Sequence, residues 1–487
     1  MAIPGVLALF LLLTSLTDLS RGLGVFDFKR VAQGVVLLLI FLIAGTRPGI
    51  RREFGRQARR MPRLAVVAVG LAMLLGLISA LRHPHPAYGL AEIAILALSV
   101  CGIFVVAACR RIAGKRFDPL VLAVLVLLGL GVAAQEFSGL LANWALDREF
   151  SYQQMLIRFA HPRFYNQLQS WTLPLLAAIP FVFGSVSHRR GLAVVCIGLQ
   201  WLILIASGGR GAFLAITISL VAIAFLVRKS RQGWFRLHVI GFILGAACYG
   251  AVVLAHSALA PAGGEFVQQS VARPLMHSTG RTHLWSLALK DAKSHPWLGA
   301  GPARFNCEGS ARLPAHPHNF PLRLAAEWGI PAAILILAVC LWICLKLLRW
   351  LWSAQLAPTG PGRKQPEALD SLLVAAILAA ALHACVSGVL MMPASQVAAV
   401  LVCGWLLGRQ PSAGDARAQR RAAGLMACLV VALIAVALNV FNMNEIRHME
   451  ARVGALAAAG PAQPRYWQYG RSCRYEYAGG SEVMAGD

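Results

Sequence analysis

The chain has few charged residues, and acidic residues are the scarcest of them. Only 13% of its 487 residues are charged and 58% are hydrophobic, whereas soluble domains carry about 25% charged residues. This shortage indicates a protein of the lipid bilayer. Aspartate and glutamate number 20 against 45 lysines and arginines, for a net charge of +25. Because the basic residues lie between long apolar runs, membrane topology explains the excess better than nucleic-acid binding does.

The sequence also lacks the short motifs that bind metals or form redox pairs. Its 11 cysteines include no CxxC pair and no zinc spacing, and no HExxH segment occurs. Most of the cysteines lie inside apolar runs, where they are expected to be small core residues. Cys307 and Cys473 fall in segments predicted to face outward, which leaves a disulfide between them open. No metal and no cofactor are predicted.

Long apolar runs divide the chain into candidate membrane spans. A spanning helix needs about 20 mostly apolar residues. The runs that approach this length are residues 2–20, 31–46, 64–81, 89–109, 118–136, 171–187, 191–207, 211–228, 236–256, 330–348, 370–391, 394–408 and 421–441. The sequence therefore predicts an all-α polytopic membrane protein with about 12–13 transmembrane helices.

The lysines and arginines between these runs predict the orientation of the chain. Alternate gaps are rich in basic residues, namely 47–63, 110–116, 189–190, 228–236, 346–364 and 409–421. The short gaps on the other side carry only Arg82 and Arg210. Cytoplasmic loops hold the basic excess in membrane proteins, so the basic-rich gaps are predicted to be cytoplasmic. One gap departs from the pattern, because Arg21, Lys29 and Arg30 lie on the basic-poor side.

This alternation predicts six parts, with no separate soluble domain. They are N-terminal transmembrane helices in residues 1–136, a periplasmic loop in 137–170, transmembrane helices with the Arg210 turn in 171–256, a large periplasmic loop in 257–329, C-terminal transmembrane helices in 330–441 and a tail in 442–487. The two long loops and the tail are predicted to face outward. In a bacterial inner membrane, outward means the periplasm.

Arg210 is the first candidate for a functional residue. It lies in the segment SGGRGA at 207–212, between two apolar runs that almost no loop separates. A charge at this depth is costly unless it faces a watery cavity or a partner. Glycines let the backbone approach a ligand, and the arginine fork suits phosphate. The pattern favours an anion-binding turn at the outer surface. The alternative is an arginine at a helix end that extends its charge into the interface.

A second group of polar residues precedes the run that starts near residue 171. Its members are Arg158, His161, Arg163, Asn166, Gln167 and Gln169. Cationic and amide side chains that arrive together at a membrane surface suit an anionic headgroup with attached sugars. The alternative is a solvated loop that caps a helix.

The predicted loop 257–329 is rich in histidine and ends in His-Pro-His-Asn at 316–319. Histidine titrates near neutral pH and is the usual general base. Pro317 restricts the backbone between His316 and His318, and Asn319 is expected to orient a ring or bind a sugar hydroxyl. A His-x-His pair without further ligands is weak evidence for a metal.

Three short motifs follow one another between residues 207 and 330. They are SGGRGA at 207–212, Arg281 and Trp285 followed by HPWLGAG at 295–301, and HPHN at 316–319 followed by EWGI at 327–330. Together they resemble the O-antigen ligase and O-antigen polymerase superfamily of bacterial membrane glycosyltransferases. The resemblance covers about residues 160–410 and departs from the family at Gly209, where many members carry serine.

The resemblance implies a C-type glycosyltransferase fold, with many helices around an outward cavity. It implies transfer of a glycan from undecaprenyl diphosphate to an acceptor hydroxyl, with inversion and without metal, at the periplasmic face of the inner membrane. In ligases the acceptor is the lipid A core, and in polymerases it is another lipid-linked repeat unit. The ligase reaction is the favoured expectation, and the polymerase reaction is its alternative.

The same resemblance assigns expected roles to individual residues. His318, beside Asn319, is the expected base, with His316 as the nearest competitor. Arg210 is expected to hold the diphosphate. The expected substrate-binding residues are Arg158, Arg163, Gln167, Arg281, His316 and Asn319.

Two other classes of membrane protein remain as alternatives. A polysaccharide flippase or exporter needs buried charges along a polar path through the membrane. The predicted spans hold few ionisable residues, among them Glu92, Glu136 and His383, which argues against that class. A scaffolding protein would tolerate replacement of Arg210 and His318.

Overall fold

The computed structural model describes eleven parts of the chain. They are residues 2–19, 25–82, 86–146, 154–159, 161–227, 232–259, 280–303, 305, 316–356, 367–410 and 423–453. Within these ranges the regular elements are all helices. Cys307 and Cys473, whose pairing the sequence left open, lie outside the described residues, as do residues 454–487 of the tail.

The described residues form a series of helices. Their bounds are α1 Ala2–Leu16, α2 Val25–Thr46, α3 Pro48–Arg60, α4 Arg63–Leu81, α5 Pro86–Ala113, α6 Phe117–Ala145, α7 Pro162–Thr172, α8 Ile179–Val182, α9 Ser187–Ala206, α10 Arg210–Leu226, α11 Gln232–Leu259, α13 Arg281–Ser294, α14 Phe320–Trp328, α15 Ile330–Leu356, α16 Ala368–Ala384, α17 Pro393–Arg409 and α18 Ala423–Val453. Short 3-10 turns are η1 Gly114–Arg116, η3 Ile157–Phe159 and η4 Leu173–Ala178.

Six helical stretches are long and apolar enough to cross a membrane. They are Phe28–Thr46, Arg63–Leu81, Pro86–Ala145, Ser187–Ala206, Gly233–Ala255 and Ile330–Ser353. The stretch Pro86–Ala145 contains both α5 and α6, and four shorter apolar helices accompany the six. The predicted fold class, an all-α polytopic membrane protein, is confirmed.

The largest difference from the predicted spans concerns residues 171–187. The structure breaks this run into the end of α7, the 3-10 turn η4 and the short helix α8. Pro174 and Pro180 lie in η4 and α8, where their missing N–H groups prevent a continuous α-helix. Helix α7 begins at Pro162 and is buried along most of its length. Part of the predicted loop 137–170 is therefore helical core.

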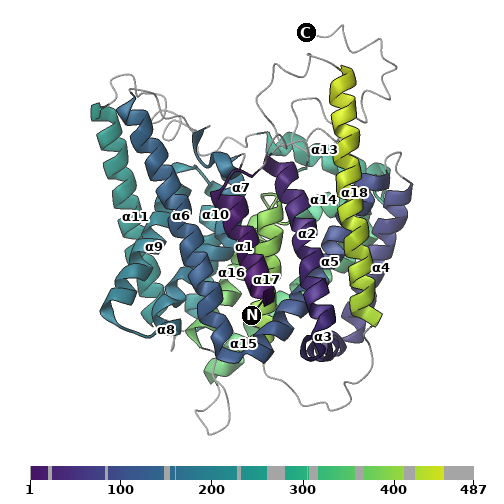
Figure 1. The fold of residues 1–487 in the computed structure, drawn as a ribbon, viewed down its shortest axis with the longest axis horizontal. Coiled ribbons are helices and arrows are strands. Elements are labelled where there is room, and N and C mark those ends of the chain that lie inside the picture. The colour runs from purple at the N-terminus through teal and green to yellow at the C-terminus, as the bar shows by residue number, and fades with distance from the viewer. Residues whose placement is uncertain are drawn as a thin grey trace.

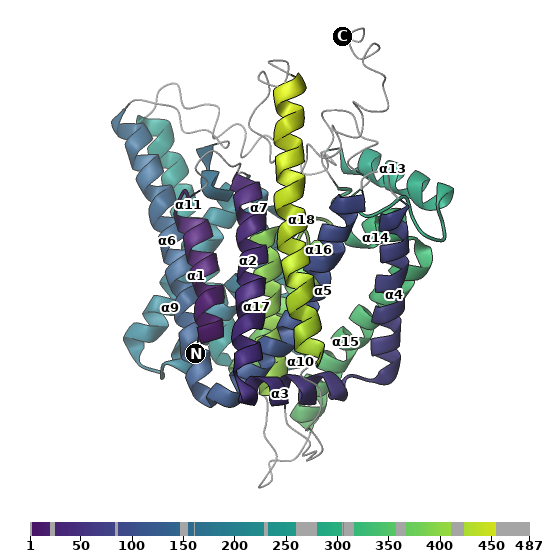
Figure 2. The same cartoon turned by 45° about the vertical axis from the view of Figure 1, so that its right-hand side comes forward.

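The bundle has two distinct ends. Helices α13 and α14 and the start of α7 lie toward the upper end in Figure 1, which we call the α13 end. Helices α3 and α8 lie at the opposite end, which we call the α3 end. Figure 2 shows α3 lying crosswise beneath the upright helices. Helix α3 contains five arginines, at positions 51, 52, 56, 59 and 60, and the last of them ends the helix.

Two of the three basic residues that broke the topology pattern, Lys29 and Arg30, are bound inside the α13 end, and the third, Arg21, lies outside the described residues. Lys29 donates from Nζ to the carbonyl of Arg158 at 2.6 Å and lies 4.1 Å from the ring centroid of Phe159. Arg30 donates to Gln396 Oε1 at 2.8 Å and to the carbonyl of Met391 at 2.7 Å. Both cations thus join helix α2 to neighbouring elements and are not loop charges.

A buried ionic network closes the α3 end. Asp118, at the start of α6, accepts hydrogen bonds from Arg110 Nη2 at 2.9 Å, Arg409 Nη1 at 2.6 Å and Trp405 Nε1 at 2.7 Å. Arg409 also binds Asp370, at the start of α16. Removing one partner of a buried ion pair costs several kcal/mol of folding stability, because the other charge is left buried and unpaired. This network therefore links α5, α6, α16 and α17.

We expect Asp118→Asn to destabilise the bundle by about 3–5 kcal/mol, because it leaves two buried arginines short of a negative charge. The matched control is Glu367→Gln, since Glu367 binds the same Arg409 at 2.9 Å but its side chain is 65% exposed. An exposed pair contributes about 0–1 kcal/mol. The apparent melting temperature in detergent measures both variants. Equal melting temperatures for the two would contradict the assignment of Asp118 as the centre of the network.

Candidate active site

Three arginines from three separate elements meet at the α13 end. Arg163 lies in the first turn of α7, Arg210 begins α10 and Arg281 begins α13. Burial lowers the pKa of the Arg281 guanidinium, and the charges of Arg163 and Arg210 lower it further. Among the described residues, neither Arg163 nor Arg281 forms an ion pair, and Arg281 Nε is buried without a hydrogen-bond partner. We call these three residues the arginine cluster.

Local sequence explains how α7 presents Arg163. Pro162 occupies the first position of the helix, where its missing N–H is not needed. His161 caps the helix, because its Nδ1 accepts the backbone N–H of Arg163 at 3.1 Å. The sequence had left a helix cap as the alternative to ligand contact for this segment, and His161 fills that structural role.

The turn that carries Arg210 is fixed against α7. Gly208 has φ of +59°, a conformation that glycine adopts without strain. A side chain at Gly209 would come within 2.8 Å of Asn166 Oδ1, so the departure from serine in the family pattern matches a close helix contact here. Asn166 Nδ2 also donates to Ser207 Oγ at 2.8 Å. The two polar segments predicted separately from sequence are therefore adjacent.

The histidine segment is held in an unusual backbone conformation. His318 has φ of +54°, which costs a residue with a side chain some strain. Its backbone N–H donates to His316 Nδ1 at 3.1 Å, and the two ring centroids are 4.3 Å apart. Trp285 of α13 donates from Nε1 to the carbonyl of Pro317 at 3.0 Å. These contacts stabilise the turn at residues 316–318, which sets the orientation of the His318 side chain.

The arginine cluster sets the electrostatics of His318. Burial lowers the pKa of His318 to about 3, and the charges of Arg163, Arg281 and His161 contribute to the shift. Burial also lowers the pKa of His316, aided by His318 and Arg323. Both rings are therefore neutral at neutral pH, which is the form that a general base requires.

Several buried polar atoms near these residues have no hydrogen-bond partner. They are Asn166 Oδ1, Gln167 Oε1 and His316 Nε2. Gly388 lies between two of these side chains, since an added Cβ would come within 2.6 Å of His316 Nε2 and 3.5 Å of Gln167 Nε2. Unpaired buried polar atoms are rare in folded proteins. Their concentration beside the arginine cluster is typical of a site that receives a polar ligand.

Two predicted site residues make other contacts. Arg158 pairs with Asp18 at 2.8 Å, and both side chains are partly exposed. Asn319 caps α14, because its Oδ1 accepts the backbone N–H of Leu322 at 2.9 Å. The structure brings Arg163, Arg210, Arg281 and His318 together but gives no contact that joins Arg158 to them.

One buried charge near the site was not selected from the sequence. Arg323 of α14 binds Glu327 Oε2 at 2.9 Å and also contacts Glu92 of α5 and Met391 Sδ. Burial raises the pKa of Glu327, and Arg323 opposes this shift. The i,i+4 spacing of Arg323 and Glu327 was the available signal. This group anchors α14, which follows the histidine segment directly.

The glycines of the HPWLGAG and EWG segments pack against each other. Gly299 has φ of +69° and Gly329 has φ of +89°, and a side chain on either would come within 2.3 Å of the backbone of the other segment. Ile330 donates its backbone N–H to the carbonyl of Pro296 at 2.8 Å. Trp297 in this loop is 76% exposed, so core packing does not account for it.

The described residues offer no group of three or more His, Cys, Asp or Glu side chains that is placed to hold a metal ion. The arrangement of the site is instead cationic, with a neutral histidine among arginines. Such an arrangement suits an anionic ligand and a proton acceptor side by side.

Comparison with known families identifies the segment that holds most of this site. Residues 192–357 match the model of a family described as O-antigen ligase. This part of the chain is therefore similar to O-antigen ligases. A search of curated proteins found no match.

The match with this family, whose members are glycosyltransferase-like membrane proteins, covers part of the site. Arg210, Arg281 and His318 fall inside the matched residues. Arg163 falls outside them, so its place in the arginine cluster comes from the tertiary structure. The resemblance inferred from the sequence motifs is confirmed.

The lowered pKa of His318 predicts how stability depends on pH. Its pKa is about 3 in the folded chain against an ordinary value of 6.5, so the unfolded chain binds the proton first as pH falls. Stability is therefore complete above about pH 6.5 and is lost toward pH 3, by up to about 1.4 kcal/mol per pH unit. We expect the apparent melting temperature in detergent to fall between pH 7 and 5.

The variant His318→Asn removes the titrating ring, so its melting temperature is expected to fall less over the same pH range. His188→Asn is the control, because His188 is exposed in the first turn of α9. A fall in the His318 variant as steep as in the parent chain would contradict the electrostatic assignment.

Proposed function

We propose that the chain is a metal-independent inverting glycosyltransferase that acts as an O-antigen ligase. It takes a glycan from undecaprenyl diphosphate and transfers it to a hydroxyl of the lipid A core, at the periplasmic face of the bacterial inner membrane. The observation that carries this proposal is a neutral, buried His318 beside three arginines that converge from α7, α10 and α13.

The arginine cluster would bind the diphosphate of the donor. A guanidinium keeps its charge and donates several hydrogen bonds in a plane, which matches phosphate oxygens. Cleavage of the sugar–phosphate bond leaves additional negative charge on the diphosphate, and preorganised cations stabilise it as it develops. The acid-poor sequence supports this role, because Arg163 and Arg210 lie between Phe150 and Gly264, where no aspartate or glutamate occurs.

His318 would accept the proton of the acceptor hydroxyl. The hydroxyl oxygen attacks the anomeric carbon of the donor sugar, and the bond from that carbon to the diphosphate breaks on the opposite face. The diphosphate leaves with the bonding electrons, so one displacement inverts the anomeric configuration. General base catalysis of this kind contributes about 10²–10⁴ in rate.

Donor binding would also strengthen the base. Burial is the largest cause of the lowered pKa of His318, and charge repulsion from Arg163 and Arg281 lowers it further. A bound diphosphate offsets that charge, so the pKa of His318 rises toward its ordinary value of 6.5. A ring with a higher pKa is a stronger base. The acceptor is therefore deprotonated most readily when a donor is in place.

Replacement of the central residues tests the reaction. We expect His318→Ala to lower transfer by about 10²–10⁴ and Arg210→Ala by about 10²–10³, measured with purified protein, lipid-linked donor and acceptor. Arg82→Ala is the control, because Arg82 is an exposed arginine at the end of α4. Unchanged melting temperatures separate lost chemistry from lost folding. Full transfer by both site variants would exclude the proposed mechanism.

A gel of the lipopolysaccharide from a deletion strain tests the acceptor. Loss of a ligase leaves long glycan chains on the lipid carrier and bare lipid A core. Loss of a polymerase leaves single repeat units attached to the core. We expect the first pattern, restored by the parent chain and not by His318→Ala. The second pattern would assign the polymerase reaction to the same site.

A further inference from the structure

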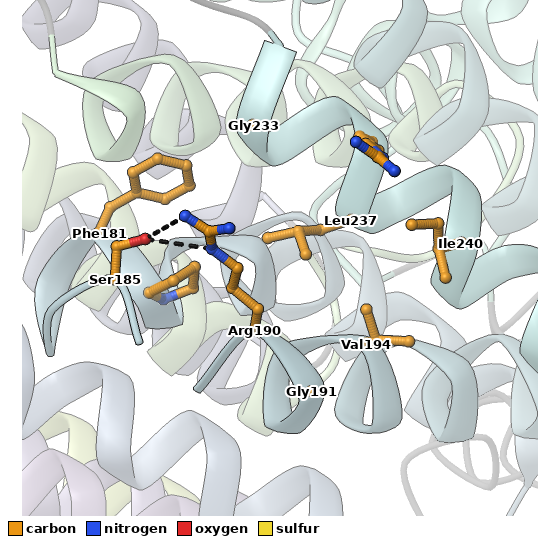
Figure 3. Close-up of a pocket in the computed structure, with 10 residues that line it drawn as sticks. Phe181, Ser185, Arg190, Gly191, Val194, Gly233, Leu237 and Ile240 are labelled. Carbon is orange, nitrogen blue, oxygen red and sulfur yellow. Dashed lines mark hydrogen bonds between the residues drawn. The ribbon is translucent and has the colours of Figure 1, made fainter. Parts of the chain in front are cut away.

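A cavity lies at the α3 end, away from the arginine cluster. It has a volume of about 520 Å³ and forms where α8, α9 and α11 meet. Figure 3 shows Phe181 and Ser185 on one side of it and Leu237 and Ile240 on the other. Arg190 and Arg236 also line it. The mechanism proposed above does not use any of these residues.

The close packing of α9 against α11 determines where the cavity lies. Helices α9 and α11 run side by side in the same direction, because an added Cβ at Gly241 would meet Ile197 at 2.5 Å and one at Gly245 would meet the carbonyl of Gly198 at 2.5 Å. The amino ends of both helices therefore lie together at the α3 end. Each end carries a partial positive charge, and α9 has no side-chain cap.

The cavity is at the opposite membrane surface from Arg210. Helix α9 has 20 residues, which span about 30 Å at 1.5 Å per residue, close to the thickness of the hydrocarbon core. Arg190 lies in the first turn of α9, and Arg210 follows its last turn. Arg190 and Arg236 are therefore at the depth of lipid headgroups.

The arginines of the cavity keep their positive charge available. Arg190 donates to Ser185 Oγ from Nε at 3.1 Å and from Nη2 at 2.7 Å, which fixes the guanidinium across the cavity (Figure 3). Ser185 is neutral, and neither arginine forms an ion pair with another described residue. The elements α8, α9 and α11 contain no carboxylate at all. Asp118 and Asp370, at the same end of the bundle, bind Arg409.

The rest of the cavity is apolar and continues onto the outer surface of the bundle. Phe181, Val194 and Leu237 line it. Farther along the same two helices, Val195 of α9 is 46% exposed and Ile243 of α11 is 60% exposed. A soluble anion would bind Arg190 and Arg236 but would leave the exposed apolar side chains of α9 and α11 uncovered. A lipid with a phosphate headgroup and acyl chains matches both parts.

We propose that this cavity binds an anionic phospholipid. Arg190 and Arg236 hold the headgroup phosphate, and the acyl chains lie along the exposed apolar side chains of α9 and α11. The site goes beyond the proposed transfer reaction, since it occupies the other membrane surface and does not depend on the identity of the donor or acceptor. The bound lipid contacts the helix whose far end carries the Arg210 turn.

Native mass spectrometry of the full chain in detergent tests the site. Delipidated protein is titrated with phosphatidylglycerol or, separately, with phosphatidylcholine. We expect selective retention of phosphatidylglycerol, weakened about fivefold for each arginine removed and roughly 25-fold in Arg190→Gln/Arg236→Gln. Gly191→Leu is expected to remove retention without removing charge, because Gly191 lines the cavity and an added Cβ there meets nothing within 4 Å.

Arg116→Gln is the matched control, since Arg116 is an exposed arginine at the same end that does not line the cavity. It is expected to retain phosphatidylglycerol as the parent chain does, and melting temperatures verify that all variants fold. Millimolar inorganic phosphate is expected to leave the lipid bound, and displacement by it would contradict a lipid ligand. Equal retention of phosphatidylcholine, or full retention by the double variant, would overturn the proposal.

Discussion

The cost of placing arginine charge inside a membrane protein shapes this structure. A buried cation needs a negative or polar partner, because the bilayer supplies none. At the α3 end, Arg110 and Arg409 satisfy this need with Asp118 and Asp370. Arg323 of α14 does so with Glu327 of the same helix and Glu92 of α5. These arginines are structural, since the protein itself supplies their carboxylates.

The arginine cluster departs from this rule. Arg163 and Arg281 form no ion pair with another described residue, and burial together with the charges of Arg163 and Arg210 lowers the pKa of Arg281. Holding like charges together costs free energy of folding. The arginine cluster has this cost, and buried polar atoms without hydrogen-bond partners lie beside it. Strain and electrostatic repulsion concentrated at one location are typical of a functional site.

Backbone devices make this convergence possible. Gly208 turns the chain tightly before α10, and Gly299 and Gly329 let two segments of the outer loop pack backbone to backbone. His318 adopts a left-handed conformation without being glycine, and the N–H contact to His316 stabilises it. Each device fixes one side chain or one helix start, so the site is assembled before any ligand binds.

Sequence by itself determined the class of the protein, because hydrophobic run length and the positions of lysine and arginine depend on the bilayer and not on packing. It also carried the resemblance to O-antigen ligases, since the motifs around Arg210, Arg281 and His318 are local. Only the tertiary structure placed the expected Arg163 beside Arg210 and Arg281, paired Arg158 with Asp18 and showed Asn319 as a helix cap. The break at Pro174 and Pro180 shows the same limit, because hydropathy records burial but not backbone hydrogen bonding. Which arginines share a site depends on contacts between segments far apart in the chain, and no local pattern encodes them.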